Sequence, residues 1–282
     1  MIGRRTLALS LVIGVATALA GRSESWAPAL TTAVTGDDNL SNSDRGPDEV
    51  SALLFEVELD ARTRRQLSRN LALSYGAAAA VEAVPEFSAL DTGRLGPRLG
   101  LHWKSGLGPY APGLHLESTA DWITVRETDR GGLAGSLALS WTKRWTDVDR
   151  CEIGVAATRH DARGPVFSRT GWTAGGHYTR DLSERWSLQA GLQYREGDVV
   201  SHATPPRPDL VAHARARTPV STFDRSFVAY RLEAQTWSAS AGMTCSLNNH
   251  TALGFQFERR DSTGAGHRYI NQLVTARLVL QF

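Results

Sequence analysis

The chain has 282 residues, of which 26 are glycine and 8 are tryptophan, and only 21% carry a charge. Its 31 basic and 29 acidic side chains leave a formal charge of +2, which excludes the strong net attraction that a nucleic-acid partner would require. The length allows one large β domain or two small ones, and the many glycines and small residues favour strands and turns.

The first 20 residues have the three parts of an export signal. Arg4 and Arg5 form a basic start, residues 7–16 are mostly apolar, and residues 18–20 offer a cleavage site of small side chains. We therefore expect residues 1–20 to be a signal peptide and the mature chain to begin near Gly21. Residues 21–282 contain no apolar run near the ~18 residues that a membrane-spanning helix needs. An exported chain of this kind is periplasmic, secreted or built into the outer membrane as a β-barrel.

Segments with strict two-residue alternation occur throughout the mature chain. A strand that crosses a bilayer needs about 9–11 residues, with an apolar face towards lipid and an inner face that tolerates polar groups. In the clearest segment, 186–195, Trp186 and Tyr194 stand at the two ends of the apolar face. The same rhythm is found at 53–60, 98–104, 114–122, 133–141, 153–157, 172–178 and 253–258. The recurrence of aromatic residues at segment ends favours a membrane barrel over a soluble sandwich.

The connections between these segments alternate in length. Short connections lie at Thr146–Arg150, Asp181–Arg185 and Leu247–His250, and longer ones at Gly36–Val50, Val81–Leu95, Val125–Gly132, Asp161–Arg169, Gly197–Asp224 and Asp261–Arg268. Outer-membrane barrels have short periplasmic turns and long external loops. Residues 21–282 are therefore predicted to form an all-β, twelve-stranded antiparallel up-and-down transmembrane β-barrel. Its first strand is Trp26–Thr35 and its last is Ile270–Phe282, with both mature termini in the periplasm.

One segment breaks the alternation. From Val228 to Ala234 the apolar residues occupy even positions, whereas from Trp237 onwards they occupy odd positions. This shift predicts a β-bulge near Thr236 or a Trp237 side chain that points inward.

The chain ends in LVTARLVLQF, ten alternating residues that close on Phe282. This ending resembles the C-terminal signature of Gram-negative outer-membrane β-barrel proteins, which their assembly machinery reads. The resemblance implies a place in the cell outer membrane, contact with the lipid bilayer and lipopolysaccharide, and recognition of Phe282 by that machinery. It specifies architecture and says nothing about cargo.

The first external loop, TGDDNLSNSDRG, is acidic and faintly similar to the opening of lipid A deacylases, which are also twelve-stranded barrels. Asp37, Asp38 and Asp44 are the candidate ligands for a calcium ion, the only cofactor that the sequence suggests. The Tyr-Thr-Asn-Gly stretch expected next in that family is absent. A solvated loop of turn-forming residues is the competing interpretation.

A second stretch, RHDARG (Arg159–Gly164), looks like the catalytic segment of outer-membrane phospholipase A. In that family a serine nucleophile follows the histidine by two residues, whereas here Ala162 follows His160. A methyl group cannot attack an ester, which puts the resemblance in doubt and leaves a polar loop entrance as the alternative.

The longest connection, Gly197–Asp224, is rich in proline and arginine. Four arginines in or just beyond it, Arg207, Arg215, Arg217 and Arg225, could grip lipopolysaccharide phosphates. A mobile surface loop without a specific ligand is the alternative interpretation.

The predicted inward face carries charges of both signs. The candidate lumen-lining residues are Glu56, Glu58, Asp60, Arg98, His102, Lys104, His115, Glu117, Asp121, His177, Arg195, Arg231, Glu233, Glu258 and Arg277. These side chains either pair across the lumen and plug it, or line a narrow water-filled pore. The many small residues on the same face favour the pore.

The leading hypothesis is therefore a narrow channel or export pore for small polar or charged solutes. One alternative is a lipid-modifying outer-membrane enzyme that resembles the deacylase or phospholipase barrels. Another is a surface protein or the barrel partner of a secretion system, without catalysis. An enzyme is the less favoured class.

Overall fold

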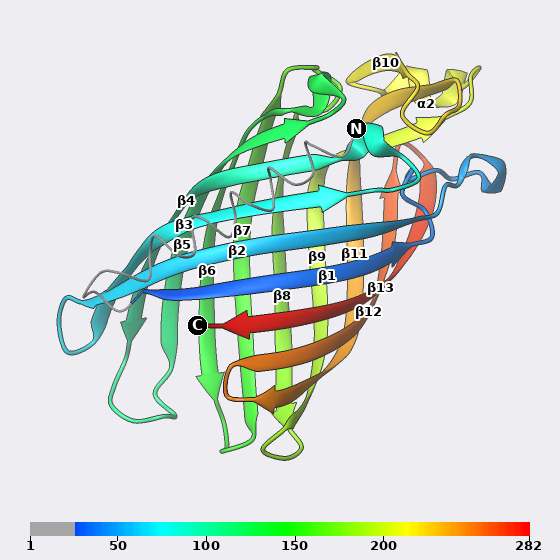
Figure 1. The fold of residues 1–282 in the computed structure, drawn as a ribbon. Coiled ribbons are helices and arrows are strands. Elements are labelled where there is room, and N and C mark those ends of the chain that lie inside the picture. The colour runs from blue at the N-terminus through cyan, green and yellow to red at the C-terminus, as the bar shows by residue number, and fades with distance from the viewer. Residues whose placement is uncertain (1–25) are drawn as a thin grey trace.

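The computed structural model describes residues 26–282, which form one closed antiparallel β-barrel (Figure 1). Twelve strands make the wall, in the order β1 to β9 followed by β11, β12 and β13. They are β1 (Ala27–Asp37), β2 (Ala52–Gln66), β3 (Leu71–Ala83), β4 (Thr92–Lys104), β5 (Gly113–Val125), β6 (Gly132–Arg144), β7 (Asp149–Ala162), β8 (Arg169–Asp181), β9 (Trp186–Ala203), β11 (Phe227–Asn248), β12 (Thr251–Gly264) and β13 (His267–Gln281). The prediction of a twelve-stranded up-and-down barrel is confirmed.

The last strand closes the barrel against the first. β13 pairs with β1 from Ala29↔Gln281 to Asp37↔Leu273, and the Phe282 N–H donates to the Pro28 carbonyl at 3.0 Å. Closure leaves no free sheet edge, which a bilayer requires because it offers no water to unpaired backbone groups. The predicted signal peptide lies outside the described residues.

The outer surface of the barrel is apolar because every second side chain of each strand faces outward. Trp122, Leu137 and Ile153 are 56%, 53% and 57% exposed, and exposed aliphatic and aromatic residues recur on strands all around the barrel. An apolar surface of this extent is costly in water and favourable in lipid, so the barrel sits in a lipid bilayer. Within residues 26–282, no helix is long and apolar enough to cross a membrane.

The two ends of the barrel differ. Short turns join neighbouring strands at one end. If the C-terminus is periplasmic, the directions of the strands make this the periplasmic end. The other end carries the longer connections, including the short helix α2 (Pro208–His213) and the strand β10 (Ala216–Val220), which pairs only with β11 (Figure 1, yellow). We call this assembly of connections the external cap.

Two of the predicted external loops are shorter than expected. The connection predicted at Asp261–Arg268 is a tight turn, because β12 and β13 stay paired up to Gly264 and His267. Its two central residues, Ala265 and Gly266, have positive φ values of 54° and 76°, as the commonest two-residue hairpin turns require. In the long connection, β9 stays paired with β11 as far as Ala203.

The predicted bulge near Thr236 is wrong. The pairing of β11 with β9 runs without a shift from Val228 to Cys245, and Trp237 is 54% exposed on the outer face. The even positions of the outer half therefore do not face lipid: Tyr230 and Leu232 are buried, at 2% and 1% exposure. They pack with Ala203 of β9 and Leu210 of α2 in an apolar core within the external cap.

Candidate functional site

Ion pairs fill the middle of the lumen along β2 to β5. On β2, the Arg62 guanidinium binds Asp60 (Nε to Oδ1, 2.8 Å) and reaches across to Glu117 of β5 (Nη1 to Oε1, 3.0 Å). Beside them, Arg98 of β4 donates to Asp121 of β5 at 2.7 Å, with both side chains nearly buried. We call these five residues the ion-pair layer. Each charge in it has a partner of opposite sign, as a confined interior requires.

A cavity lies on each side of this layer. The lower cavity, of about 610 Å³, is lined near the short turns by basic groups, among them Arg64, Lys104 and Arg144. The upper cavity, of about 560 Å³, lies beneath the external cap. None of the five residues of the ion-pair layer lines either cavity, and along β2 and β4 the layer lies between the two. The lumen is thus two polar chambers divided at mid-height.

Most of the predicted lumen residues belong to the ion-pair layer or line one of the two cavities. Asp60, Arg98, Glu117 and Asp121 belong to the ion-pair layer, His102, Lys104, His115 and His177 line the lower cavity, and Glu56 and Arg195 line the upper one. Glu58 binds Arg94, Glu258 binds Arg260, and Arg277 donates to Gln256. Whether any of them governs transport stays a prediction.

Arg231 and Glu233 do not line the lumen, contrary to the prediction. They share the face of β11 that carries Trp237, in a part of the strand that extends into the external cap. Arg231 Nη1 donates to the carbonyls of Pro165 and Ser168, at 2.9 and 3.1 Å, and Glu233 forms an ion pair with Arg215. The error follows from the bulge that the sequence predicted and the strand does not have.

Several charged residues that face inward were not among the predicted lumen residues. Arg62, Arg94 and Arg260 share the phase of Asp60, Arg98 and Glu258 on their own strands, so the alternation alone could have found them. Glu82 and Arg169, which line the upper cavity, occupy strand ends that were predicted to be loops.

The wall from β6 to β12 is built differently. Its inward positions include Ser136, Ala138, Ser140, Gly154, Gly175, Gly191, Ser240 and Gly254. A Cβ atom at Gly191 would lie 2.6 Å from Nδ1 of His177, and one at Gly254 would lie 3.0 Å from Nε of Arg277. These glycines make room for the larger side chains beside them. We call this surface the small-residue wall.

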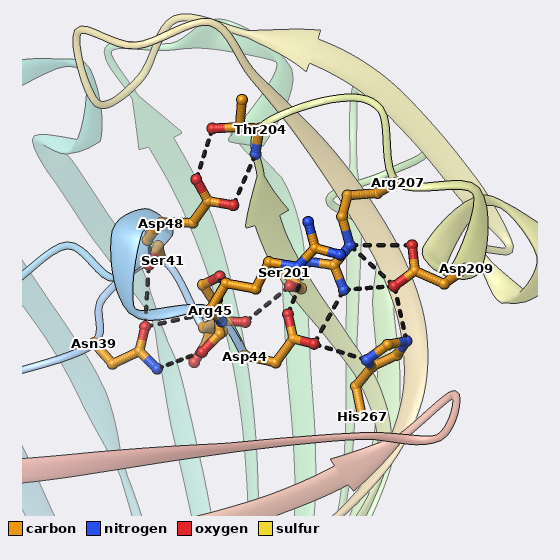
Figure 2. A network of polar contacts seen from close by, with 12 residues as sticks. Asn39, Ser41, Asp44, Arg45, Asp48, Ser201, Thr204, Arg207, Asp209 and His267 are labelled. Carbon is orange, nitrogen blue, oxygen red and sulfur yellow. Dashed lines mark hydrogen bonds and ion pairs between the residues drawn. The ribbon is translucent and has the colours of Figure 1, made fainter.

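A polar network holds the external cap together. Figure 2 shows the Arg207 guanidinium between Asp44 and Asp209, with Nη1 2.8 Å from Asp44 Oδ1 and Nη2 2.8 Å from Asp209 Oδ2. His267 joins the same carboxylates, 2.7 Å from Asp44 and 3.2 Å from Asp209. Arg207 has no exposed side-chain surface, and its hydrogen bonds hold the pKa of Asp209 well below the usual range. This latch joins the long connection to the first external loop and to the β12–β13 turn.

A second set of contacts ties the first loop to β9. Thr204 donates to Asp48 through its hydroxyl (2.6 Å) and its backbone N–H (3.1 Å). His202, which lies beyond the part of β9 that pairs with β8, approaches the Ser41 carbonyl with Nδ1 (3.1 Å) and Arg130 Nη2 with Nε2 (3.0 Å). Burial, aided by the Arg130 charge, lowers the pKa of His202 to about 3, so the ring is neutral. Its Nδ1 therefore donates and its Nε2 accepts.

The predicted calcium ligands do not converge. Asp37 accepts from the Asn39 N–H, Asp38 accepts from the Gln272 N–H, and Asp44 belongs to the latch. Within residues 26–282 no group of three or more acidic, histidine or cysteine side chains is arranged to hold a metal ion. The first loop therefore uses its acidic groups to bind protein donors.

Most of the arginines predicted to grip lipopolysaccharide are bound to the protein itself. Arg207 is part of the latch, Arg215 binds Asp198 and Glu233, and Arg225 donates to the Pro47 carbonyl. Arg217 is exposed and forms no hydrogen bond or ion pair within residues 26–282.

The histidine of the phospholipase-like stretch lies inside the barrel. His160 lines the upper cavity, and both of its ring nitrogens are covered without a hydrogen-bond partner among the described residues. Such a position does not present a catalytic group to lipid on the outer surface.

Comparison with solved structures agrees with this architecture. An outer-membrane channel from Pseudomonas putida F1 is similar with a TM-score of 0.57 and 14% identity, over 93% of this chain and 98% of that chain. The KdgM porin gives 0.47 and 7% identity over 90% and 99%, and the CymD monoaromatic hydrocarbon channel gives 0.47 and 12% over 96% and 92%. No protein family and no curated protein matches the sequence. The likeness to the Pseudomonas channel shows the fold alone, which is that of an outer-membrane β-barrel.

Proposed function

We propose that the protein is a narrow channel of the outer membrane through which small polar or charged solutes pass. The observation that carries the proposal is the asymmetry of the lumen: the ion-pair layer occupies β2 to β5, whereas the adjoining strands β6 and β7 present Ala138 and Ala156 beside Glu117. Polar cavities of about 560 and 610 Å³ lie above and below. A water-filled path along the small-residue wall would join them.

The external cap would determine which solutes enter the channel from outside. The latch and the contacts of His202 hold the long connection across the first loop, so the cap is an ordered structure rather than a free surface loop. A solute that enters from outside would pass beside charged groups of the upper cavity before it reaches the ion-pair layer.

Conductance in planar bilayers tests the proposal. Purified protein that shows the mobility shift of a folded barrel on heating should produce discrete current steps in potassium chloride. The steps should be well below those of sixteen-stranded porins, because twelve strands enclose a narrower lumen. Detergent without protein is the control. Folded protein that gives no steps over a wide voltage range would refute the channel.

Export and assembly are part of the same proposal. Removal of residues 1–20 as a signal peptide would bring the chain to the periplasm, and the C-terminal Phe282, 69% exposed, would be read by the assembly machinery. The Phe282→Ala variant should then reach the outer membrane in smaller amounts than the parent. Lipopolysaccharide would surround the outer half, with Arg217 as the available phosphate contact. The proposal assigns no step to calcium, and the candidate carboxylates accept hydrogen bonds from protein donors.

A further inference from the structure

An acidic pair and a basic pair of side chains face each other across the upper cavity. Glu56 and Glu82 are direct cross-strand partners on β2 and β3, and His160 and Arg169 are direct partners on β7 and β8. All four line the same cavity. In a closed ring of twelve strands, β2 and β8 are six positions apart and therefore lie on opposite sides. The cavity is polarised from one wall to the other.

The acidic side has three carboxylates, those of Glu56, Glu58 and Glu82, beside one arginine, Arg94. Arg94 is shared between Glu56 and Glu58, while Glu82 forms no hydrogen bond or ion pair within residues 26–282. Like charges directly opposite on neighbouring strands destabilise each other. A cationic group in the cavity beside Glu82 would relieve this repulsion.

Within residues 26–282, the one carboxylate placed near the basic arginines, that of Asp198, is bound by Thr170 and Arg215. Arg169 is exposed to the cavity and has no hydrogen-bond or ion-pair partner among the described residues. The Arg195 guanidinium extends over Gly171, with Nε 3.7 Å from where a Cβ would be, and donates to the Asp198 carbonyl at 3.0 Å. The two ring nitrogens of His160, which have no hydrogen-bond partner among the described residues, are also available to a ligand. Paired guanidinium forks match the geometry of a carboxylate, to which they can donate two parallel hydrogen bonds.

We infer that the upper cavity is a binding site for a small zwitterion, with its carboxylate against Arg169 and Arg195 and its ammonium group against Glu82. This inference rests on the proposed channel and names the class of solute that passes through it. A dianion would meet repulsion at the acidic side, and a diamine would meet it at the basic side. The volume of about 560 Å³ suits a solute of amino-acid size rather than an oligomer.

Calorimetry on the folded protein in detergent tests the site without relying on conductance. The probes are γ-aminobutyrate, glutarate and cadaverine, which have similar length and differ in the charges at their ends. We expect γ-aminobutyrate to bind more tightly than glutarate or cadaverine. Arg169→Gln should weaken its binding about tenfold, as the loss of a charge-assisted contact implies, and Glu82→Gln should move the preference to glutarate.

Arg150→Gln is the matched control, because Arg150 lines the lower cavity and its loss should leave γ-aminobutyrate binding unchanged. Heat-modified mobility on gels verifies that each variant is folded. Tightest binding of glutarate or cadaverine by the parent, no binding of any probe, or equal losses in Arg150→Gln and Arg169→Gln would overturn the inference.

Conductance then separates the two proposals. γ-Aminobutyrate added on the external side should interrupt the single-channel current of the parent, and about tenfold more should be needed for Arg169→Gln. A protein that binds the probe but never conducts refutes the channel and leaves the site standing. A protein that conducts and ignores the probe refutes the site and leaves the channel standing.

Discussion

The two sides of the lumen are lined by different kinds of side chain. From β2 to β5 the interior is filled by long charged side chains that neutralise one another, with Arg62 spanning to Glu117 three strands away. Ala78 and Ala80 of the intervening β3 are almost fully buried beneath them. From β6 to β12, serine, alanine and glycine occupy many inward positions, and larger polar side chains such as His177 and Arg195 stand between them. Side chains, and not strand number alone, therefore set how much of the lumen is filled.

Arg62→Gln is expected to have the largest effect on this contrast. The substitution leaves Asp60 and Glu117 without their shared cation, so the lumen gains uncompensated negative charge. We expect a shift of the reversal potential towards cation selectivity and a loss of roughly 1–2 kcal/mol in unfolding free energy, moderated because these groups are partly hydrated. Reversal potentials in a salt gradient and urea titration measure the two effects. Arg150→Gln, outside the layer, should change neither by as much, and an unchanged selectivity in Arg62→Gln would contradict the role of the layer.

Ala138→Phe should narrow the path where the small-residue wall borders the ion-pair layer, because Ala138 is the direct partner of Glu117. Ala138 faces inward on β6, paired with Ala156, so a ring at this position projects towards the ion-pair layer. The single-channel conductance should fall several-fold. Ala157→Phe on the outward face of β7 is the control, since it adds the same ring to the lipid side. Equal conductance in the two variants would show that ions do not pass along the small-residue wall.

Arg207→Gln should loosen the external cap without changing the barrel. The substitution removes ion pairs to Asp44 and Asp209, and the neutral amide cannot replace the guanidinium fork. Trypsin should cleave residues 204–217 faster, with more frequent current fluctuations. Val211→Ala, at an exposed position of the same connection that is not a trypsin site, provides the comparison. Cleavage at the parent rate in Arg207→Gln would mean that the latch does not hold the connection.

Acid should loosen the cap through His202. Because the folded pKa is depressed to about 3, the unfolded cap binds more protons than the folded one between pH 3 and about 6.5. The contribution of His202 is complete above pH 6.5 and is lost as the pH falls towards 3, by at most about 1.4 kcal/mol per pH unit. Hydrogen exchange of residues 198–204 at pH 7 and pH 5 measures the change. His202→Asn should flatten this dependence, whereas an equal dependence in the variant would assign it to other groups.

The sequence predicted the barrel well because membrane strands follow a simple physical rule. Lipid selects the outward side chains one by one, so Trp122, Leu137 and Ile153 reveal their direction without knowledge of their neighbours. The same rule failed at Tyr230 and Leu232, which are apolar and yet face the cap. There the strand has left the bilayer, and the helix α2 supplies a second apolar environment that the alternation cannot distinguish from lipid.

The candidate site was predicted only in part, because its pairings depend on register. The inward phase of Asp60, Arg98 and Glu258 could be seen in the sequence. The contact between Arg62 and Glu117 could not, since it joins strands three positions apart. The latch was equally hidden: Arg207 and Asp44 are 163 residues apart and meet only when the long connection folds onto the first loop.

Cysteine accessibility in the open channel tests the central claim most directly. In a background with Cys151→Ala and Cys245→Ala, Ser140→Cys would stand on the small-residue wall, and Ala78→Cys would lie beneath the charged side chains of β2 to β5. A membrane-impermeant thiol reagent added to a single conducting channel should react at position 140 and reduce the current stepwise, and should react much more slowly at position 78. Reaction at position 78 alone, or at neither position, would contradict a passage along the small-residue wall.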